Sequence, residues 1–106
     1  MANQQYEVIV SDAALSMLDR HMDFLAKVSK NAAMKAKNEI ISDMRSLRKN
    51  PERYPVYENQ FIKEIRYRKM FSAKRYLIFY EITDTAVYVD YIVDCRQDYE
   101  WLLIDD

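Results

Sequence analysis

The sequence predicts an α+β domain in which a first strand and a helical hairpin precede three strands in an antiparallel meander, with a short C-terminal helix or tail. Two observations support this order. Apolar residues recur every three or four positions between residues 12 and 50, whereas alternating segments rich in β-branched and aromatic residues dominate from residue 61 onward. Helices that precede a run of strands pack together on one face of the sheet. A chain of 106 residues has the length of one domain, so we expect residues 1–106 to form a single unit whose other sheet face is open to a ligand.

The first half of the chain predicts one strand and two helices. Residues 6–10 are β-branched and aromatic, as in a strand. Ser11 suits the N-cap of a helix over residues 12–29. Asn31 is the expected cap of a second helix, which the pair Asn50-Pro51 ends. The short link between the helices predicts a hairpin.

The second half predicts three strands after a loop at residues 51–59. Residues 61–69 alternate between apolar and charged side chains, and residues 75–82 are apolar on both faces, as in a central strand. Residues 86–94 alternate again, and residues 98–103 form a short helix or remain extended. Strict alternation in the last strand places four residues on one face: Val87, Val89, Tyr91 and Val93.

The chain contains no glycine, although an average composition would give about seven in this length. Phosphate-binding P-loops, dinucleotide-binding fingerprints and nucleophile elbows all use glycine for tight turns or for close approach of the backbone to a ligand. The composition therefore excludes these classes of site.

Metal, disulfide and membrane features are also missing from the sequence. Cys95 is the only cysteine and His21 the only histidine, so we expect no disulfide within the chain, no metal and no cofactor. We interpret Cys95 as a buried thiol and His21 as a residue with a structural role. Without a long apolar run or the features of a secretion signal, we expect a cytoplasmic protein with no membrane contact.

Charge is distributed unevenly along the chain. The formal net charge is −1, but ten basic and three acidic residues give residues 45–75 a charge of +7. Such segregation predicts an electropositive surface that meets a polyanion, and an ordinary solvated face is the alternative.

Arginine suits a phosphate ligand because its planar guanidinium stays charged and donates two parallel hydrogen bonds. In a meander, the arginines of the second half would come toward one region. Cleavage of RNA requires a base, stabilisation of a phosphorane and an acid. Arginine supplies only the stabilisation, so the base or acid would be Tyr99, a lysine or a carboxylate such as Glu64. The candidate catalytic residues are Arg66, Arg68, Arg75, Arg96 and Tyr99, and the candidate RNA-binding residues are Lys63, Lys69 and Lys74.

These candidates also have structural interpretations. Arg66 and Arg68 share one face of a strand and would form a solvated surface paired with Glu64. Arg96 lies among acidic neighbours, so an ion pair that holds the tail is the alternative to an active role. Tyr99 is one of nine tyrosines, and such residues more often belong to the core or its rim.

Four segments, in this order and spacing, carry a resemblance to a known family. They are Leu47-Arg48-Lys49-Asn50-Pro51, Lys63-Glu64-Ile65-Arg66, Tyr76-Leu77-Ile78-Phe79-Tyr80-Glu81-Ile82 and Arg96-Gln97-Asp98-Tyr99-Glu100-Trp101-Leu102-Leu103. The chain resembles the RelE/ParE superfamily of toxins from bacterial type II toxin–antitoxin modules. The resemblance implies a toxin that a cognate antitoxin protein neutralises, and a complex that binds operator DNA through the antitoxin. Trp101 and Leu102 would contact that antitoxin, with packing on the core as the alternative.

The two branches of the superfamily imply different targets. RelE-like members cut mRNA on the ribosome without a metal, and their basic residues fall on or near Arg66, Arg68 and Arg96. ParE-like members poison DNA gyrase. We take the ribosome-dependent mRNA endonuclease as the main interpretation, and a gyrase inhibitor or a decayed, antitoxin-binding homologue as the alternatives.

This chain departs from the RelE-like pattern at several positions. Asp94 stands where many members carry a histidine, and Gln97 where many carry an arginine. Leu77 replaces an arginine common early in the central strand, unless Arg75 substitutes for it. The net charge of −1 also contrasts with the strongly basic character of RelE-like nucleases.

Overall fold

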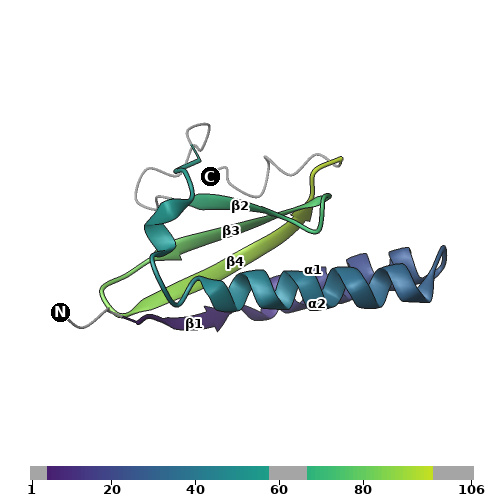
Figure 1. The fold of residues 1–106 in the computed structure, drawn as a ribbon, viewed down its shortest axis with the longest axis horizontal. Coiled ribbons are helices and arrows are strands. Elements are labelled where there is room, and N and C mark those ends of the chain that lie inside the picture. Colours follow the sequence, from purple (N-terminus) through teal and green to yellow (C-terminus); the bar gives the residue numbers. More distant parts are fainter. Residues whose placement is uncertain (1–4, 58–66, 97–106) are drawn as a thin grey trace.

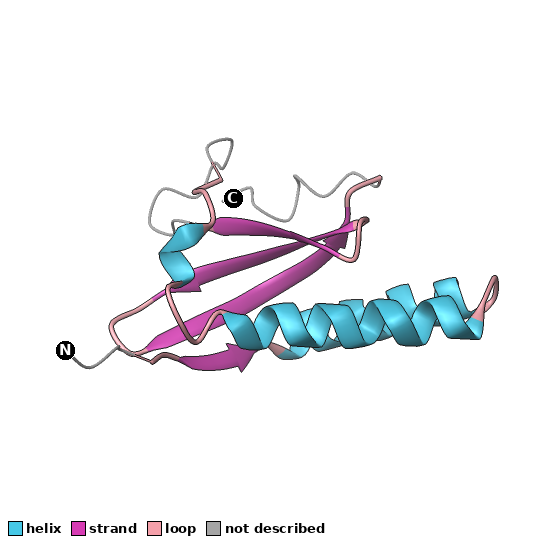
Figure 2. Cartoon of the chain, in the orientation of Figure 1, coloured by secondary structure: helices cyan, strands magenta, loops and turns pink. Residues whose placement is uncertain are grey.

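A four-stranded sheet with two helices along one side makes up the fold of the computed structural model, which describes residues 5–57 and 67–96 (Figures 1 and 2). The sheet has the order β1-β4-β3-β2. The meander of β2, β3 and β4 is antiparallel, as predicted, and β1 adds to β4 in parallel. The elements are β1 (Glu7–Val10), α1 (Asp12–Ala26), α2 (Lys30–Ser46), the 3-10 helix η1 (Pro51–Arg53), β2 (Arg68–Ser72), β3 (Tyr76–Ile82) and β4 (Ala86–Asp94).

Serine hydroxyl groups begin both helices. The Ser11 side chain accepts a hydrogen bond from the Ala14 amide, as predicted for an N-cap. Ser29 caps α2 in the same way by accepting from the Ala32 amide, so the prediction of Asn31 as the cap is wrong. The reason is that α1 ends at Ala26, three residues before the predicted end, which leaves Ser29 extended and free to cap. Neither described helix is long and apolar enough to cross a membrane.

The second strand ends later than predicted. The sequence placed it at residues 61–69, whereas β2 runs from Arg68 to Ser72, and residues 61–66 lie outside the described part of the chain. Pairing continues to Ser72 because Met70 and Ser72 are buried on the helix side of the sheet, where Ser72 Oγ donates to Asp43 Oδ2 of α2 at 2.6 Å. The core between the sheet and the helices is built mainly from Leu18, Met22, Ile40, Met44, Leu47, Met70, Ile78, Tyr80, Val87, Val89 and Ile92.

A β-bulge at Asp90 divides β4 into two halves that face differently. Phe79 pairs with Tyr91 and Tyr80 pairs with Val89, so Asp90 has no partner residue on β3. The extra residue reverses the alternation of faces. Val87 and Val89 therefore share the helix side with Ile92, whereas Tyr91 and Val93 pack with Phe79 on the other side. The prediction that Val87, Val89, Tyr91 and Val93 share one face is wrong for this reason.

Candidate functional site

Helix α1 takes the place of a strand along the second half of β4. Strand β1 ends at Val10, and the Ser11 amide then donates to the carbonyl of Val89. Ser11 Oγ donates to the carbonyl of Asp90 at 3.0 Å, and His21 Nε2 lies 2.8 Å from the carbonyl oxygen of Ile92. Because a carbonyl only accepts, Nε2 must carry the hydrogen. His21 thus holds α1 against the edge of β4, and its ring lies 5.2 Å from that of Tyr76.

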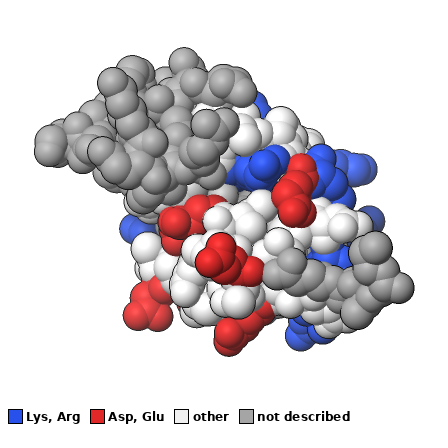
Figure 3. All heavy atoms as spheres, turned by 90° about the vertical axis from the view of Figure 1, so that its left-hand side faces the viewer, with Lys and Arg blue, Asp and Glu red and all other residues white. Residues whose placement is uncertain are grey.

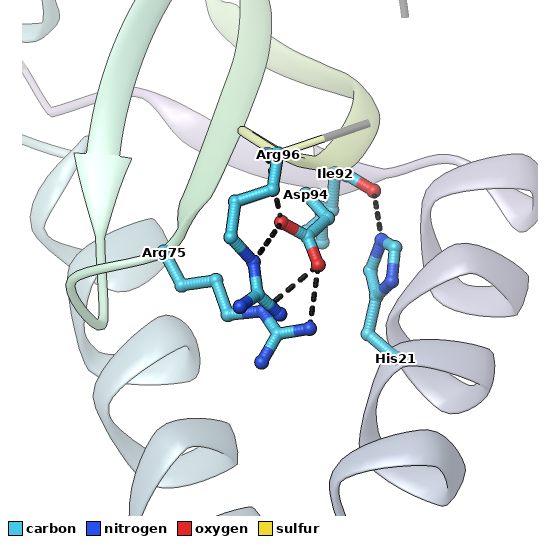
Figure 4. Close-up of polar contacts among 5 residues, drawn as sticks. All are labelled: His21, Arg75, Ile92, Asp94 and Arg96. Carbon is cyan, nitrogen blue, oxygen red and sulfur yellow. Dashed lines mark hydrogen bonds and ion pairs between the residues drawn. The ribbon is translucent and has the colours of Figure 1, made fainter. Parts of the chain in front are cut away.

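The end of β4 carries an ion-pair network that we call the Asp94 cluster, formed by Arg75, Asp94 and Arg96 (Figure 4). Arg75 Nε donates to Asp94 Oδ2 at 2.8 Å, and Arg75 Nη2 lies 2.8 Å from the same oxygen. The other oxygen accepts from the Arg96 amide at 3.0 Å and lies 3.6 Å from Arg96 Nε. One carboxylate thus holds two guanidinium groups.

The protonation state of Asp94 follows from these contacts. Asp94 is only 3% exposed, and burial by itself would raise the pKa of its carboxyl. The backbone N–H of Arg96 and the guanidinium of Arg75 outweigh burial, and together they hold the pKa of Asp94 below its ordinary value. Asp94 is therefore ionised at neutral pH and accepts hydrogen bonds, but it has no proton to donate.

The structure brings together two of the four predicted catalytic arginines. Arg75 and Arg96 meet at Asp94, but Arg68 stands at the start of β2, four residues and about 13 Å of strand from Ser72 at the other end. Arg68 Nη1 donates there to the carbonyl oxygens of Glu52 and Tyr54, at 3.0 and 2.7 Å. The predicted convergence is therefore wrong for Arg68, because its guanidinium serves the backbone around η1 at the opposite end of the β2–β3 hairpin (Figure 1).

Of the other predicted site residues, two lie in the described part of the chain and five lie outside it. Lys69 Nζ lies 5.5 Å from the centre of the Tyr57 ring, and Lys74 is exposed in the β2–β3 turn. The remaining five lie outside the described residues, and their roles stay predictions. They are Lys63, Arg66, Tyr99, Trp101 and Leu102.

Several basic side chains of the +7 segment are engaged in structure. Arg53 Nη1 donates to the carbonyl oxygens of Ser46, Lys49 and Asn50, which caps the end of α2. On the end of the molecule that carries η1 and the β3–β4 turn, acidic groups stand among the basic ones (Figure 3). The face drawn there therefore lacks a continuous basic surface among the residues that the structure describes.

The β-bulge creates a second titratable group of residues that the sequence analysis missed. Tyr67 donates its hydroxyl hydrogen to Asp90 Oδ2 at 2.8 Å. A hydrogen bond with Asp90, aided by burial, raises the pKa of Glu81 to about 7. Burial and the same carboxylate also raise the pKa of Tyr67. The sequence does show one acidic residue, Asp90, in the middle of an otherwise apolar strand, and this was the signal for a polar site. The side of the sheet on which Asp90 lies depends on the bulge, which the sequence does not reveal.

Neither site offers a preformed metal centre. Across residues 5–57 and 67–96, no group of three or more His, Cys, Asp or Glu side chains is placed to hold a metal ion. Arg75 and Arg96 are both held by the carboxylate of Asp94, and Glu81 can exchange a proton near neutral pH.

Comparison with known families identifies the family to which this chain belongs. The family model described as "ParE toxin of type II toxin-antitoxin system, parDE" matches residues 8–99. The chain belongs to this ParE toxin family. The RelE/ParE resemblance and the predicted fold class are thereby confirmed, and the protein is a toxin of the type II toxin–antitoxin class.

A solved structure has the same fold as this ParE-family toxin. A chain from the chromosomal ParDE TA system from P. aeruginosa superposes with a TM-score of 0.70 at 12% sequence identity. The match covers 86% of this chain and 97% of that chain. No curated protein is significantly similar in sequence. At this low identity, the structural match supports the fold alone.

Proposed function

We propose that this ParE-family toxin inhibits growth by acting on DNA gyrase, and that a cognate antitoxin protein neutralises it. The observation that carries the proposal is the match of the ParE toxin model over residues 8–99, since ParE-like members of the superfamily poison gyrase. The proposal places the toxin in the cytoplasm, where gyrase acts on DNA. Any contact with operator DNA would be made through the antitoxin complex.

The geometry of the arginines supports this branch over the mRNA endonuclease that the sequence analysis favoured. A nuclease needs guanidinium groups free to stabilise a phosphorane. Here Arg75 and Arg96 share the carboxylate of Asp94, and Arg68 binds backbone carbonyl oxygens at the far end of the hairpin. Asp94 is also ionised, so it cannot serve as the acid.

A supercoiling assay with purified gyrase, relaxed plasmid and ATP tests the proposal. We expect a dose-dependent loss of supercoiling by the purified toxin, with linear DNA appearing after protein digestion, because a trapped cleavage complex leaves a double-strand break. Prior addition of the protein encoded beside the toxin gene should restore supercoiling.

Two results would replace this function with another. Normal supercoiling together with transcripts cut at ribosomal A sites, mapped by primer extension, would establish the mRNA endonuclease. Normal supercoiling together with harmless overexpression would instead indicate a decayed homologue that retains only antitoxin binding.

A further inference from the structure

A second apolar cluster lies on the face of the sheet turned away from the helices. We call it the far-face cluster, and it consists of Tyr57, Tyr67, Phe79 and Val93. Tyr57 and Tyr67 stand edge-on to the Phe79 ring, with 5.2 and 6.4 Å between the ring centres. All four residues are buried, with exposed fractions between 1% and 6%. This part of the sheet face is therefore not open to a ligand, contrary to the expectation from the sequence.

Burial increases along a row of side chains that crosses this face. Phe71, Leu77 and Val93 are paired in register across β2, β3 and β4. Phe71 is 58% exposed, Leu77 is partly buried and Val93 is 5% exposed. Met17 of α1 packs against the cluster from the edge of β4 and is itself only partly buried. The exposure pattern thus points to a cover over β4 and β3 that stops short of Phe71.

The chain leaves β4 at this end of the sheet. The Cys95 amide donates to the carbonyl of Arg75 at 2.9 Å, and the Arg96 amide donates to Asp94 Oδ1 at 3.0 Å. These bonds fix the point from which residues 97–106 start. Ten extended residues reach about 33 Å, whereas the seven residues of β3 span about 23 Å. The segment is therefore long enough to run back over the whole length of the face.

The composition of residues 97–106 suits an apolar face bordered by a cation. The segment contains four consecutive large apolar residues, four acidic residues and no lysine or arginine: Trp101, Leu102, Leu103 and Ile104, and Asp98, Glu100, Asp105 and Asp106. Lys69 of β2 stands beside the cluster, with its Nζ 5.5 Å from the centre of the Tyr57 ring. The acids of this face, Glu81 and Asp90, lie farther from the chain exit, toward the other end of β3. The segment is thus complementary to the face in both hydrophobicity and charge.

Two other covers agree less well with these observations. Residues 58–66 follow Tyr57 and precede Tyr67, and the Tyr57 amide donates to the Tyr67 carbonyl at 2.7 Å. Both ends of that segment are therefore anchored near the start of β2, whereas Val93 lies in register with the end of β2. A partner protein would leave the cluster exposed in the free toxin, but the burial is that of a single chain. The cover therefore belongs to this chain.

We infer that residues 97–106 fold back over the far-face cluster and that Trp101 packs on it. Burial of tryptophan and of the three aliphatic residues after it removes a large apolar surface from water, which stabilises the closed arrangement. The inference goes beyond the proposed function and does not depend on it. It places Trp101 and Leu102 within the fold, in place of the predicted antitoxin contact. Any partner of this sheet face would first have to displace the segment.

Trp101 is the only tryptophan in the chain, so intrinsic fluorescence of the full-length toxin reports on its surroundings. In the free toxin we expect emission at a shorter wavelength than in the urea-unfolded chain, and acrylamide quenching at least about threefold weaker. Neither value should change with toxin concentration or on addition of the protein encoded beside the toxin gene. Nuclear Overhauser contacts should join the indole to Leu77, Phe79 or Val93.

Three results would overturn the inference. An indole that is exposed in the free toxin and shielded only after the antitoxin is added would establish the antitoxin contact instead. Shielding that appears only at high toxin concentration would assign the cover to a second copy of the chain. An indole that is exposed under all conditions, or buried with contacts only to the helix side of the sheet, would leave the far-face cluster to residues 58–66.

Two matched variants of β4 test the contact from the other side. Val93→Ala and Val87→Ala each remove two carbon atoms, the first from the far face and the second from the helix side. Both should lower Tm, but only Val93→Ala should strengthen acrylamide quenching of Trp101, by at least about twofold. Equal quenching in the two folded variants would contradict the inference. These measurements use no gyrase, so their failure would leave the proposed function in place, and failure of the supercoiling assay would leave this inference in place.

Discussion

Arg75 binds Asp94 through two nitrogen atoms, Nε and Nη2, each 2.8 Å from the same carboxylate oxygen. Asp94 is the last residue of β4, and Arg75 directly precedes β3, so this contact ties the β2–β3 turn to the end of the neighbouring strand. The Cys95 amide adds a backbone hydrogen bond to the carbonyl of Arg75 at 2.9 Å. The pair therefore decides where the guanidinium group of Arg75 lies.

Asp94→Asn should destabilise the protein. The substitution keeps the shape but leaves two guanidinium groups without their anion, and loss of one partner of a buried pair costs several kcal/mol. Because Arg96 is largely exposed and Arg75 is partly so, we expect the free energy of unfolding in urea to fall by about 2 kcal/mol. Asp19→Asn, on the exposed side of α1, is the matched control and should change it by less than about 0.5 kcal/mol. Equal stability of the two variants would show that the Asp94 cluster contributes nothing.

Glu81 should make stability depend on pH. Its folded-state pKa is raised to about 7 from an ordinary value of 4.5, so the folded protein holds a proton that the unfolded chain has released. Stability contributed by this proton is present below pH 4.5 and is lost as the pH rises toward 7. Glu81 is partly exposed, and we therefore expect a change on the order of 1 kcal/mol.

Glu81→Gln isolates that contribution because glutamine resembles the protonated acid. The variant should lose the pH dependence between 4.5 and 7 and should be more stable than wild type at pH 8, measured by urea unfolding across the range. Glu39→Gln, on an exposed position of α2, should follow the wild-type curve. Parallel curves for wild type and Glu81→Gln would contradict a shared proton between Glu81 and Asp90.

His21→Ala should loosen α1 from β4. The variant leaves the carbonyl of Ile92 without the donor at 2.8 Å, and a buried, unsatisfied carbonyl costs about 1–3 kcal/mol. We expect faster amide hydrogen exchange in α1 and the second half of β4, together with a lower Tm. His21→Gln retains a donor and should recover part of the loss. Unchanged exchange in the alanine variant would rule out this role for His21.

Arg68→Met and Arg96→Met should have opposite effects on stability and function. Arg68 donates to the carbonyl oxygens of Glu52 and Tyr54, so its loss should lower the free energy of unfolding by about 1 kcal/mol with little effect on inhibition by the folded protein. Arg96 is largely exposed, so its loss should cost little stability but weaken target inhibition. Loss of gyrase inhibition by a fully folded Arg68→Met variant would instead show that Arg68 acts on the target and not only on the backbone around η1. Urea unfolding and the supercoiling assay, run on the same preparations, measure both quantities.

The local pattern of residues predicted most of the elements. Strand β4 has the predicted bounds, β3 begins one residue after its predicted start, and Ser11 is the predicted cap of α1. These features depend on neighbours within a few positions in the chain, such as a hydroxyl that reaches an amide three residues on. The late end of β2 was missed because it is set by burial of Met70 and Ser72 against distant helices.

The candidate site depended far more on contacts between distant parts of the chain. Five of the named site residues lie outside the described part, and of the remaining arginines only Arg75 and Arg96 share a location. Arg68 has the same chemistry, but the direction of the β2–β3 hairpin carries it away from the other two. This separation follows only once the position of the turn is known, because antiparallel pairing places the residues nearest the turn together and separates those farther from it.

From the sequence alone, the order of elements, the absence of glycine-dependent sites and the RelE/ParE resemblance were accessible, because periodicity, composition and short motifs are local properties. Only the tertiary structure decided that Asp94 binds two guanidinium groups and that Asp90 lies beside Glu81. Each of these depends on strand register, and a single bulged residue changes which side chains meet.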